Sequence, residues 1–353
     1  MSTEPQAPPA RRPETGPPRA QLRDVALLLP GQGAQYRRMG AGLFPAEPAF
    51  ARAMNEVFAM MGVRGEQLRS DWLAERPSLP TEHASWSQPL LFAIDYALGR
   101  LVLSWDLRPT ALLGHSVGEI AAAALAGIFE LGDAISLVLD RVDRVAAAPP
   151  GGMLAVAATA DEVAPLLPAD VVIGAVNAPR NTVIAGPRAE LDRAARILSE
   201  HAIVTMTVPS LSAFHSPSVW PALAGTQAGV AALPRRLPTI TVISGYSAAP
   251  LRPQDVRDPA FWARQPADPV LFWPALGTLL AGTALTLIEA GPGQLLSRIA
   301  RLHPAVRRGT STVVPLLPAA PADGDEPDRA ALRAALGRLR ELGYAVPPAP
   351  SPH

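Results

Sequence analysis

The sequence contains no cysteine and no lysine. The absence of cysteine excludes disulfides, thiolate catalysis and cysteine-ligated zinc. All 31 basic residues are therefore arginine, and they balance 31 acidic residues. A net charge of zero gives no reason to expect a nucleic acid or a membrane surface as a partner.

Aromatic residues and long apolar runs are also scarce. Aromatics make up 5% of the chain against 48% hydrophobic residues, so alanine, leucine and valine must supply most of the core. No run approaches the ~18 uninterrupted apolar residues of a membrane helix. The N-terminus has no apolar segment typical of a signal peptide. These absences lead us to expect a cytoplasmic globular protein.

What the sequence does contain is an alternation of strand and helix patterns. The Pro- and Arg-rich residues 1–22 are predicted to form a disordered tail. The apolar run 24–30 predicts a buried strand, and the apolar spacing in 87–105 is helical. A strand-like segment at 110–114 leads into an alanine-rich helix at 117–127. This alternation favours an α/β fold with a helix-covered sheet.

The segment 151–211 has a different order of predicted strands and helices. Its strand, helix, two strands, helix and strand follow the order of a ferredoxin-like unit. We therefore predict a small subdomain inserted into a large domain made of residues 23–150 and 212–311. Residues 312–353 are predicted to be a C-terminal extension with one helix. The packing face of that helix consists of Leu332, Leu336, Leu339 and Leu342.

The motif G-x-S-x-G at residues 114–118 makes Ser116 a candidate nucleophile. The predicted strand, tight turn and helix around it form the context that exposes such a serine hydroxyl. The following helix also offers backbone N–H groups to an anion. The alternative is that Ser116 only fits a tight turn.

A serine nucleophile needs a base, and the chain has six histidines. His215 lies where the chain re-enters the large domain, so we take it as the candidate base. His115 is expected to point away from the site and to be structural. No acid between Ser116 and His215 stands out as the third member, but a carbonyl can also orient an imidazole. The remaining histidines lie in loops, at helix ends or near the terminus: His83, His201, His303 and His353.

A series of segments then gives the chain a resemblance to a known family. It resembles the malonyl-CoA:acyl carrier protein transacylases and, more closely, the acyltransferase domains of modular polyketide synthases over about residues 24–345. This resemblance implies a hydrolase-like parallel-sheet large domain with an inserted ferredoxin-like subdomain. The segments, in chain order, are LLLPGQGAQYRRMG, SQPLLFAIDYAL, GHSVGE, GGMLAV, VNAPRNTVIAG, SAFHSP, DPVLFWPAL and IEAGPGQLLSRI.

The resemblance implies roles for the catalytic residues. Ser116 matches the serine that carries the acyl group, and His215 matches its base. The backbone N–H groups of Gln32 and Val117 match the oxyanion hole. Gln265 matches the position whose main-chain carbonyl orients the histidine, which replaces the missing acid.

The resemblance also bears on the substrate. Arg141 matches the arginine that pairs with the free carboxylate of a malonyl-type acyl group. Phe214 matches the bulky residue that crowds an α-methyl group. Ser212 stands where the malonyl signature has histidine, so a wider pocket and a substituted malonyl unit remain open. Gln88 and Asn177 match polar residues that line the site or support its backbone.

The implied activity is ping-pong acyl transfer in polyketide and antibiotic biosynthesis. The acyl group moves from acyl-CoA to Ser116 and then to the phosphopantetheine thiol of an acyl carrier protein, with no bound cofactor and no metal. Because the chain begins at Met1 without a preceding ketosynthase, we expect a freestanding, monomeric enzyme that acts in trans; an excised domain is the alternative. The alternatives are carrier-to-carrier transfer of a larger acyl group, an editing acyl hydrolase, and an inactive carrier-docking scaffold.

Overall fold

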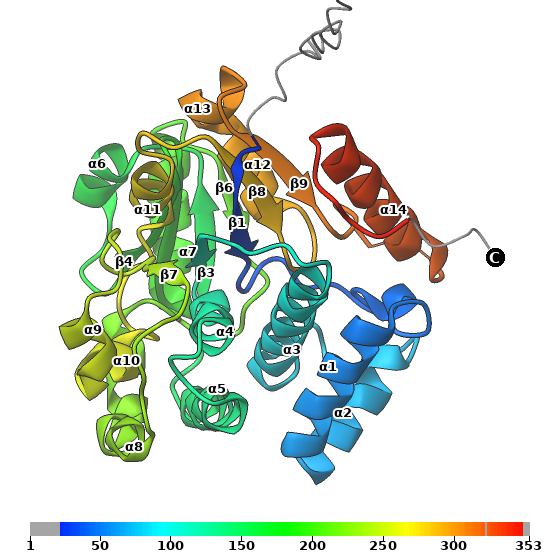
Figure 1. The fold of residues 1–353 in the computed structure, drawn as a ribbon. Coiled ribbons are helices and arrows are strands. Elements are labelled where there is room, and N and C mark those ends of the chain that lie inside the picture. The colour runs from blue at the N-terminus through cyan, green and yellow to red at the C-terminus, as the bar shows by residue number, and fades with distance from the viewer. Residues whose placement is uncertain (1–21, 322, 349–353) are drawn as a thin grey trace, which may run out of the picture.

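The computed structural model describes residues 22–321 and 323–348. Its larger sheet has five parallel strands in the order β7-β2-β1-β8-β9 (Figure 1). Because β1 and β2 are neighbours and parallel, the loops that leave their carboxyl ends lie side by side. The strands are β1 (Asp24–Leu29), β2 (Ala111–Gly114), β7 (Thr241–Ile243), β8 (Leu285–Glu289) and β9 (Thr312–Pro315).

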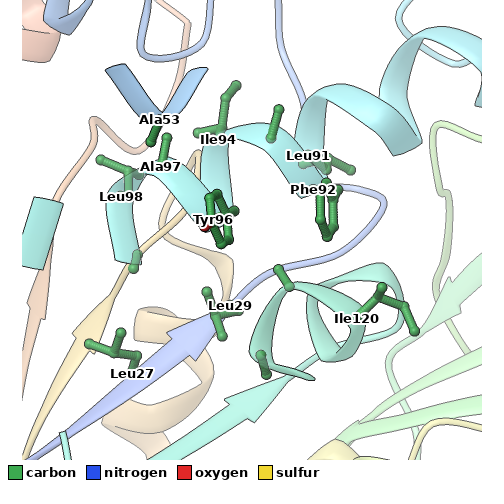
Figure 2. Packing of buried hydrophobic residues seen from close by; sticks show 14 of the residues in the cluster. Leu27, Leu29, Ala53, Leu91, Phe92, Ile94, Tyr96, Ala97, Leu98 and Ile120 are labelled. Atoms are coloured by element: carbon green, nitrogen blue, oxygen red, sulfur yellow. The ribbon is translucent and has the colours of Figure 1, made fainter. Parts of the chain in front are cut away.

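Alternate side chains of β1 enter two different cores, as the two-residue period of a strand requires. Leu27 and Leu29 join the larger core, and Leu28 joins a second core on the other face. Figure 2 shows Leu27 and Leu29 near side chains of α3 (Ala84–Ser104) and α4 (Val117–Leu125). The strand that leads to the site is therefore buried on both faces.

The other helices of the large domain surround this sheet. No described helix is long and apolar enough to cross a membrane. The α-helices are α1 (Pro48–Met60), α2 (Val63–Leu73), α5 (Leu131–Ala146), α8 (Thr226–Ala232), α9 (Pro253–Arg257), α10 (Pro259–Arg264), α11 (Phe272–Leu279), α12 (Leu295–Leu302), α13 (Pro304–Arg307) and α14 (Glu326–Glu341). The short 3₁₀ helices of the large domain are η1 (Ala41–Leu43) and η3 (Pro217–Leu223), and η2 (Ala164–Leu166) belongs to the inserted subdomain.

A second, antiparallel sheet forms the inserted subdomain. Its strand order β4-β5-β3-β6 is that of a ferredoxin-like unit, which confirms the predicted fold class. Its backbone is tied to the large domain where Val176 N–H donates to the carbonyl of Val270 at 2.8 Å. The elements are β3 (Gly151–Val156), α6 (Ala160–Val163), β4 (Val172–Ala178), β5 (Asn181–Pro187), α7 (Arg188–Glu200) and β6 (Thr205–Thr207).

The C-terminal segment differs in part from the prediction. The boundary at residue 312 is wrong, because β9 pairs with β8 and completes the large sheet. Helix α14 then packs at this edge, with Leu332, Leu336 and Leu339 buried and Leu342 partly buried. The predicted packing face of the helix is therefore confirmed. The predicted tail at residues 1–22 and His353 lie outside the described residues, except for Leu22.

Candidate active site

Ser116 occupies a sharp turn between β2 and α4. Its φ of 56° and ψ of −118° are unusual for a residue with a side chain. Glycine is required on both sides, since a Cβ on Gly114 would lie 2.2 Å from the Glu119 nitrogen. A Cβ on Gly118 would lie 2.1 Å from the Leu29 carbonyl oxygen. The G-x-S-x-G spacing thus reflects a tight strand–turn–helix that presents the serine hydroxyl.

The loop after β1 packs directly against this turn. A Cβ on Gly31 would lie 2.3 Å from the His115 carbonyl oxygen, so only glycine fits there. The next residue, Gln32, is held through its side chain: Oε1 accepts from Gln88 Nε2 at 2.8 Å, and Nε2 donates to the Pro209 carbonyl at 3.1 Å. Gln88 therefore supports Gln32 and does not line the cavity.

Two backbone N–H groups beside Ser116 remain available. Among the described residues, neither the amide of Gln32 nor that of Val117 donates to another protein group. Val117 is the first residue of α4, where the helix dipole adds partial positive charge. A free amide on each side of a serine can stabilise an oxyanion.

His215 lies within hydrogen-bond distance of the serine. Its Nε2 is 2.8 Å from Ser116 Oγ, and its Nδ1 is 2.8 Å from the Asp268 carbonyl oxygen. Because a carbonyl only accepts, Nδ1 carries the proton and Nε2 is left free to accept the proton of the serine. The His215 backbone N–H also donates to the Pro266 carbonyl at 2.6 Å, which fixes the residue at its φ of 62°.

The surroundings keep the imidazole neutral. Burial lowers the pKa of His215 to about 3, with further lowering by His115 and Arg141 and partial compensation from the Asp268 carbonyl. A buried imidazolium is costly because it loses the solvation of its charge. His215 is therefore in its basic form at neutral pH.

The role expected of Gln265 requires correction. The acceptor for His215 Nδ1 is the carbonyl of Asp268, three residues further along, and the Gln265 carbonyl contributes only the smallest effect on the His215 pKa. The side chain of Gln265 has a different position, because Oε1 accepts from Arg141 Nη2 at 3.1 Å and Nε2 donates to Glu119 Oε1 at 3.3 Å. Gln265 thus connects Arg141 to Glu119.

Arg141 and Glu119 are buried behind the turn. Arg141, on α5, is 2% exposed, and its charge forms no ion pair within the described part of the chain. Burial raises the pKa of Glu119 to about 7, although Gly245 N–H, the Ser244 hydroxyl and Arg141 favour its charged form. The result is a buried guanidinium close to the serine and histidine.

A cavity of about 190 Å³ opens onto Ser116 and His215. Phe214 lines it from the large domain, and Asn177 lines it from the inserted subdomain. Asn177 Oδ1 lies 2.8 Å from Nε2 of His115, so this histidine also borders the cavity. The expectation that His115 points away is therefore wrong.

Some predicted residues do not reach the cavity. Ser212 is absent from its lining, so the structure does not bear out a wall widened by this residue. Arg141 also lies outside the lining, on the buried side of the serine–histidine pair. The sequence analysis did not assign roles to Glu119, Tyr246 and Arg298. Glu119 lies in GHSVGE, one helical turn after the serine, and Arg298 lies in IEAGPGQLLSRI, whereas Tyr246 lies in none of the quoted segments. Within the described ranges, no group of three or more histidine or acidic residues is placed to hold a metal ion.

The fold and the site define an α/β enzyme class built around a serine on a strand–turn–helix. A family model described as "Acyl transferase domain" matches residues 27–324, and the chain belongs to this family. It is therefore an acyltransferase, as the sequence predicted.

A known polyketide synthase is also similar to this chain in sequence. One polypeptide of the phenolphthiocerol/phthiocerol polyketide synthase of Mycobacterium tuberculosis is 36% identical over 325 residues, covering 91% of this chain and 21% of that protein. This chain thus spans about a fifth of the length of that relative.

Two solved structures are also similar. The acyltransferase domain from the second module of the salinomycin polyketide synthase is 34% identical, with a TM-score of 0.81 over 92% of this chain and 74% of that one. The acyl transferase domain of SpnD, in complex with 2-(pent-4-yn-1-yl)malonyl, is 29% identical, with a TM-score of 0.85 over 93% and 79%. The resemblance to polyketide synthase acyltransferase domains is confirmed.

Proposed function

We propose that this acyltransferase moves a malonyl-type group from CoA to the phosphopantetheine thiol of an acyl carrier protein in polyketide biosynthesis. The single observation that carries the proposal is the hydrogen-bonded series from Ser116 Oγ through His215 to the Asp268 carbonyl, which opens onto the cavity. A serine paired with a neutral imidazole is a nucleophile for an acyl thioester.

The first half-reaction acylates the serine. His215 Nε2 accepts the hydroxyl proton while Ser116 Oγ attacks the thioester carbon. The amides of Gln32 and Val117 receive the negative charge that forms on the carbonyl oxygen. The tetrahedral intermediate then collapses, the C–S bond breaks, and the CoA thiolate takes the proton from His215.

The second half-reaction runs the same steps in the other direction. The thiol of the carrier protein gives its proton to His215 and attacks the Ser116 ester, and the C–O bond breaks as the serine regains its proton. The Asp268 carbonyl holds the imidazole orientation throughout and accepts the Nδ1 hydrogen bond. It carries no full charge, so it stabilises the transient imidazolium less than a carboxylate would.

Arg141 and Phe214 are the residues that we propose select the acyl group. A buried guanidinium without an ion pair in the described chain matches a carboxylate that enters the same dry region. Phe214 is 2% exposed and lines the cavity, where its ring would crowd a substituent on the α-carbon. Since Ser212 does not line this cavity, malonyl is the acyl group that the site favours.

The entrance of the cavity is suited to the phosphate-bearing chains of CoA and of the carrier's phosphopantetheine. Arg298, on α12, lines the cavity, is exposed, and forms no ion pair with the described residues. Both CoA and phosphopantetheine carry phosphate groups, and arginine binds phosphate through two parallel hydrogen bonds. We assign Arg298 to this contact.

The test separates transfer from hydrolysis. The protein is mixed with malonyl-CoA and a separately prepared carrier protein bearing phosphopantetheine, and free CoA, malonyl-carrier and free malonate are quantified. We expect malonyl-carrier to form in step with CoA release, which would also support action in trans. Malonate formed at the same rate with and without the carrier would identify a hydrolase instead. Loading only from an acylated carrier would favour carrier-to-carrier transfer.

A further inference from the structure

Tyr246, just after β7, has a buried hydroxyl that the mechanism above does not use. This hydroxyl has no partner at normal hydrogen-bond geometry among the residues that the structure describes, although it lies near the Ser116 hydroxyl. The centre of its ring lies 6.2 Å from that of His215. Buried polar groups are nearly always paired in native proteins, so an unpaired hydroxyl beside a reactive serine indicates a partner supplied by the substrate.

The position of Tyr246 is fixed relative to the nucleophile. Its backbone N–H donates to Ser244 Oγ at 3.0 Å, and that hydroxyl donates to Glu119 Oε1 at 2.9 Å. The N–H of Gly245 donates to Glu119 Oε2 at 2.7 Å. Because Glu119 lies one helical turn after Ser116 on α4, one buried carboxyl ties the Tyr246 loop to the nucleophile turn.

The groups that face the hydroxyl make it a hydrogen-bond donor. Burial raises the pKa of Tyr246 most, and Glu119 and Asp268 raise it further, while Arg141 and the Ser116 hydroxyl lower it. The phenol therefore stays protonated at neutral pH. Arg141 is the one cation among these groups, and its attraction for negative charge acts on the same place.

Two donors with unused hydrogen-bonding capacity thus lie near Ser116 and His215, just outside the residues that line the cavity. Arg141 donates one hydrogen bond to Gln265 and has no ion pair in the described chain. The Tyr246 hydroxyl donates no hydrogen bond of normal geometry to a described residue. A carboxylate has two oxygens and accepts up to about four hydrogen bonds, so it can satisfy both donors at once. A neutral acyl group such as acetyl would leave the Tyr246 hydroxyl and the remaining N–H groups of Arg141 unused.

We propose that Tyr246 is a specificity-determining residue whose hydroxyl donates to the free carboxylate of the acyl group bound at Ser116, alongside Arg141. This inference rests on the proposed function, since it requires a dicarboxylic acyl donor. Selection for malonyl over acetyl then comes from a cation and a neutral donor acting together.

The test compares Tyr246→Phe with the wild type for malonyl-CoA and acetyl-CoA, with kcat/KM measured for CoA release in the presence of the carrier. The matched control is Tyr36→Phe, because Tyr36 also has a buried hydroxyl without a partner in the described structure but lies beside Asp328. We expect Tyr246→Phe to lower kcat/KM for malonyl-CoA by about 10- to 100-fold, the usual effect of losing a hydrogen bond to a charged group. The value for acetyl-CoA should stay within about 3-fold, and the control should change neither.

Two results would overturn the inference. An unchanged malonyl value would mean that the hydroxyl does not contact the carboxylate. An equal loss for both donors would mean that the hydroxyl serves Ser116 itself. Failure of the wild type to release CoA from any acyl-CoA would count against the proposed function instead, and melting curves of both variants check that the fold is retained.

Discussion

The two sides of the cavity are built differently. The large domain supplies Ser116 and His215, which are buried, have left-handed backbone angles and are held by several hydrogen bonds. The inserted subdomain supplies mainly apolar side chains, such as Met153 and Met206, and Met206 is 70% exposed. The difference indicates that the large domain fixes the catalytic geometry. The wall formed by the inserted subdomain only accommodates the substrate, so substitutions there should lower activity less.

The substitution His215→Ala is expected to have the largest effect, because it removes the base that the large domain supplies. Without the base, acyl loading should fall by about 10⁴- to 10⁶-fold, as it does when one member of a catalytic unit is removed. Rates of CoA release from malonyl-CoA in the wild type and the variant measure the loss. His201→Ala serves as the control, because His201 is exposed at the end of α7 in the inserted subdomain and should change the rate little. A loss of less than tenfold in His215→Ala would rule out His215 as the base.

Arg141→Ala should have the next largest effect, and it depends on the substrate. Removal of the buried cation should lower malonyl transfer by about 30- to several-thousand-fold, the usual effect of leaving a buried charge unpaired. Acetyl transfer should fall much less, because acetyl has no carboxylate. The measurement is kcat/KM for malonyl-CoA and for acetyl-CoA in the wild type and in Arg141→Ala. An equal loss for both acyl donors would show that Arg141 has a structural role only.

Phe214→Ser tests the size of the acyl site. The wild type should prefer malonyl-CoA over methylmalonyl-CoA by about 10- to 200-fold, the selectivity that one methyl group supports in a pocket. The variant should narrow this ratio. Met206→Ser, on the facing wall, should leave it within about 3-fold. Equal use of both donors by the wild type would show that Phe214 does not crowd the α-carbon.

The smallest expected effect is on the pH profile. Because burial lowers the pKa of His215 to about 3, the base stays unprotonated as the pH falls from 8 to 5. An imidazole with an ordinary pKa of about 6.5 would lose about 30-fold in activity at pH 5. We expect less than a 2-fold change in kcat/KM that is due to His215. Because Glu119 has a pKa of about 7, the same profile is measured in Glu119→Gln. A single-proton loss near pH 6.5 that persists in this variant, with the fold intact by circular dichroism, would contradict the environment described for His215.

Much of this architecture could be predicted from the sequence because local patterns encode it. The apolar run of β1, the glycines around Ser116 and the alternating strands of the inserted subdomain each require a particular backbone. The sequence pattern of α2 indicates a helix less clearly, because α2 buries only Gly65, Leu68 and Trp72 and its other residues are mostly polar. Strand β9 is short and only partly buried, so its place in the sheet depends on pairing with β8.

The parts of the site that escaped prediction depend on tertiary contacts. The acceptor for His215 is a backbone carbonyl, and every residue has one, so the sequence could not distinguish Asp268 from Gln265. The buried network of Glu119, Ser244 and Tyr246 joins residues that are more than a hundred positions apart in the chain. The cavity position of His115 depends on Asn177, which belongs to the inserted subdomain.

The central claim is that Ser116 carries the acyl group, and peptide mass spectrometry after brief incubation with malonyl-CoA tests it most directly. The account predicts a malonyl ester on the peptide that contains Ser116 in the wild type, and no adduct in Ser116→Ala, whose melting temperature should stay close to that of the wild type. A malonyl adduct that persists in Ser116→Ala, or that maps to another residue in the wild type, would contradict the account.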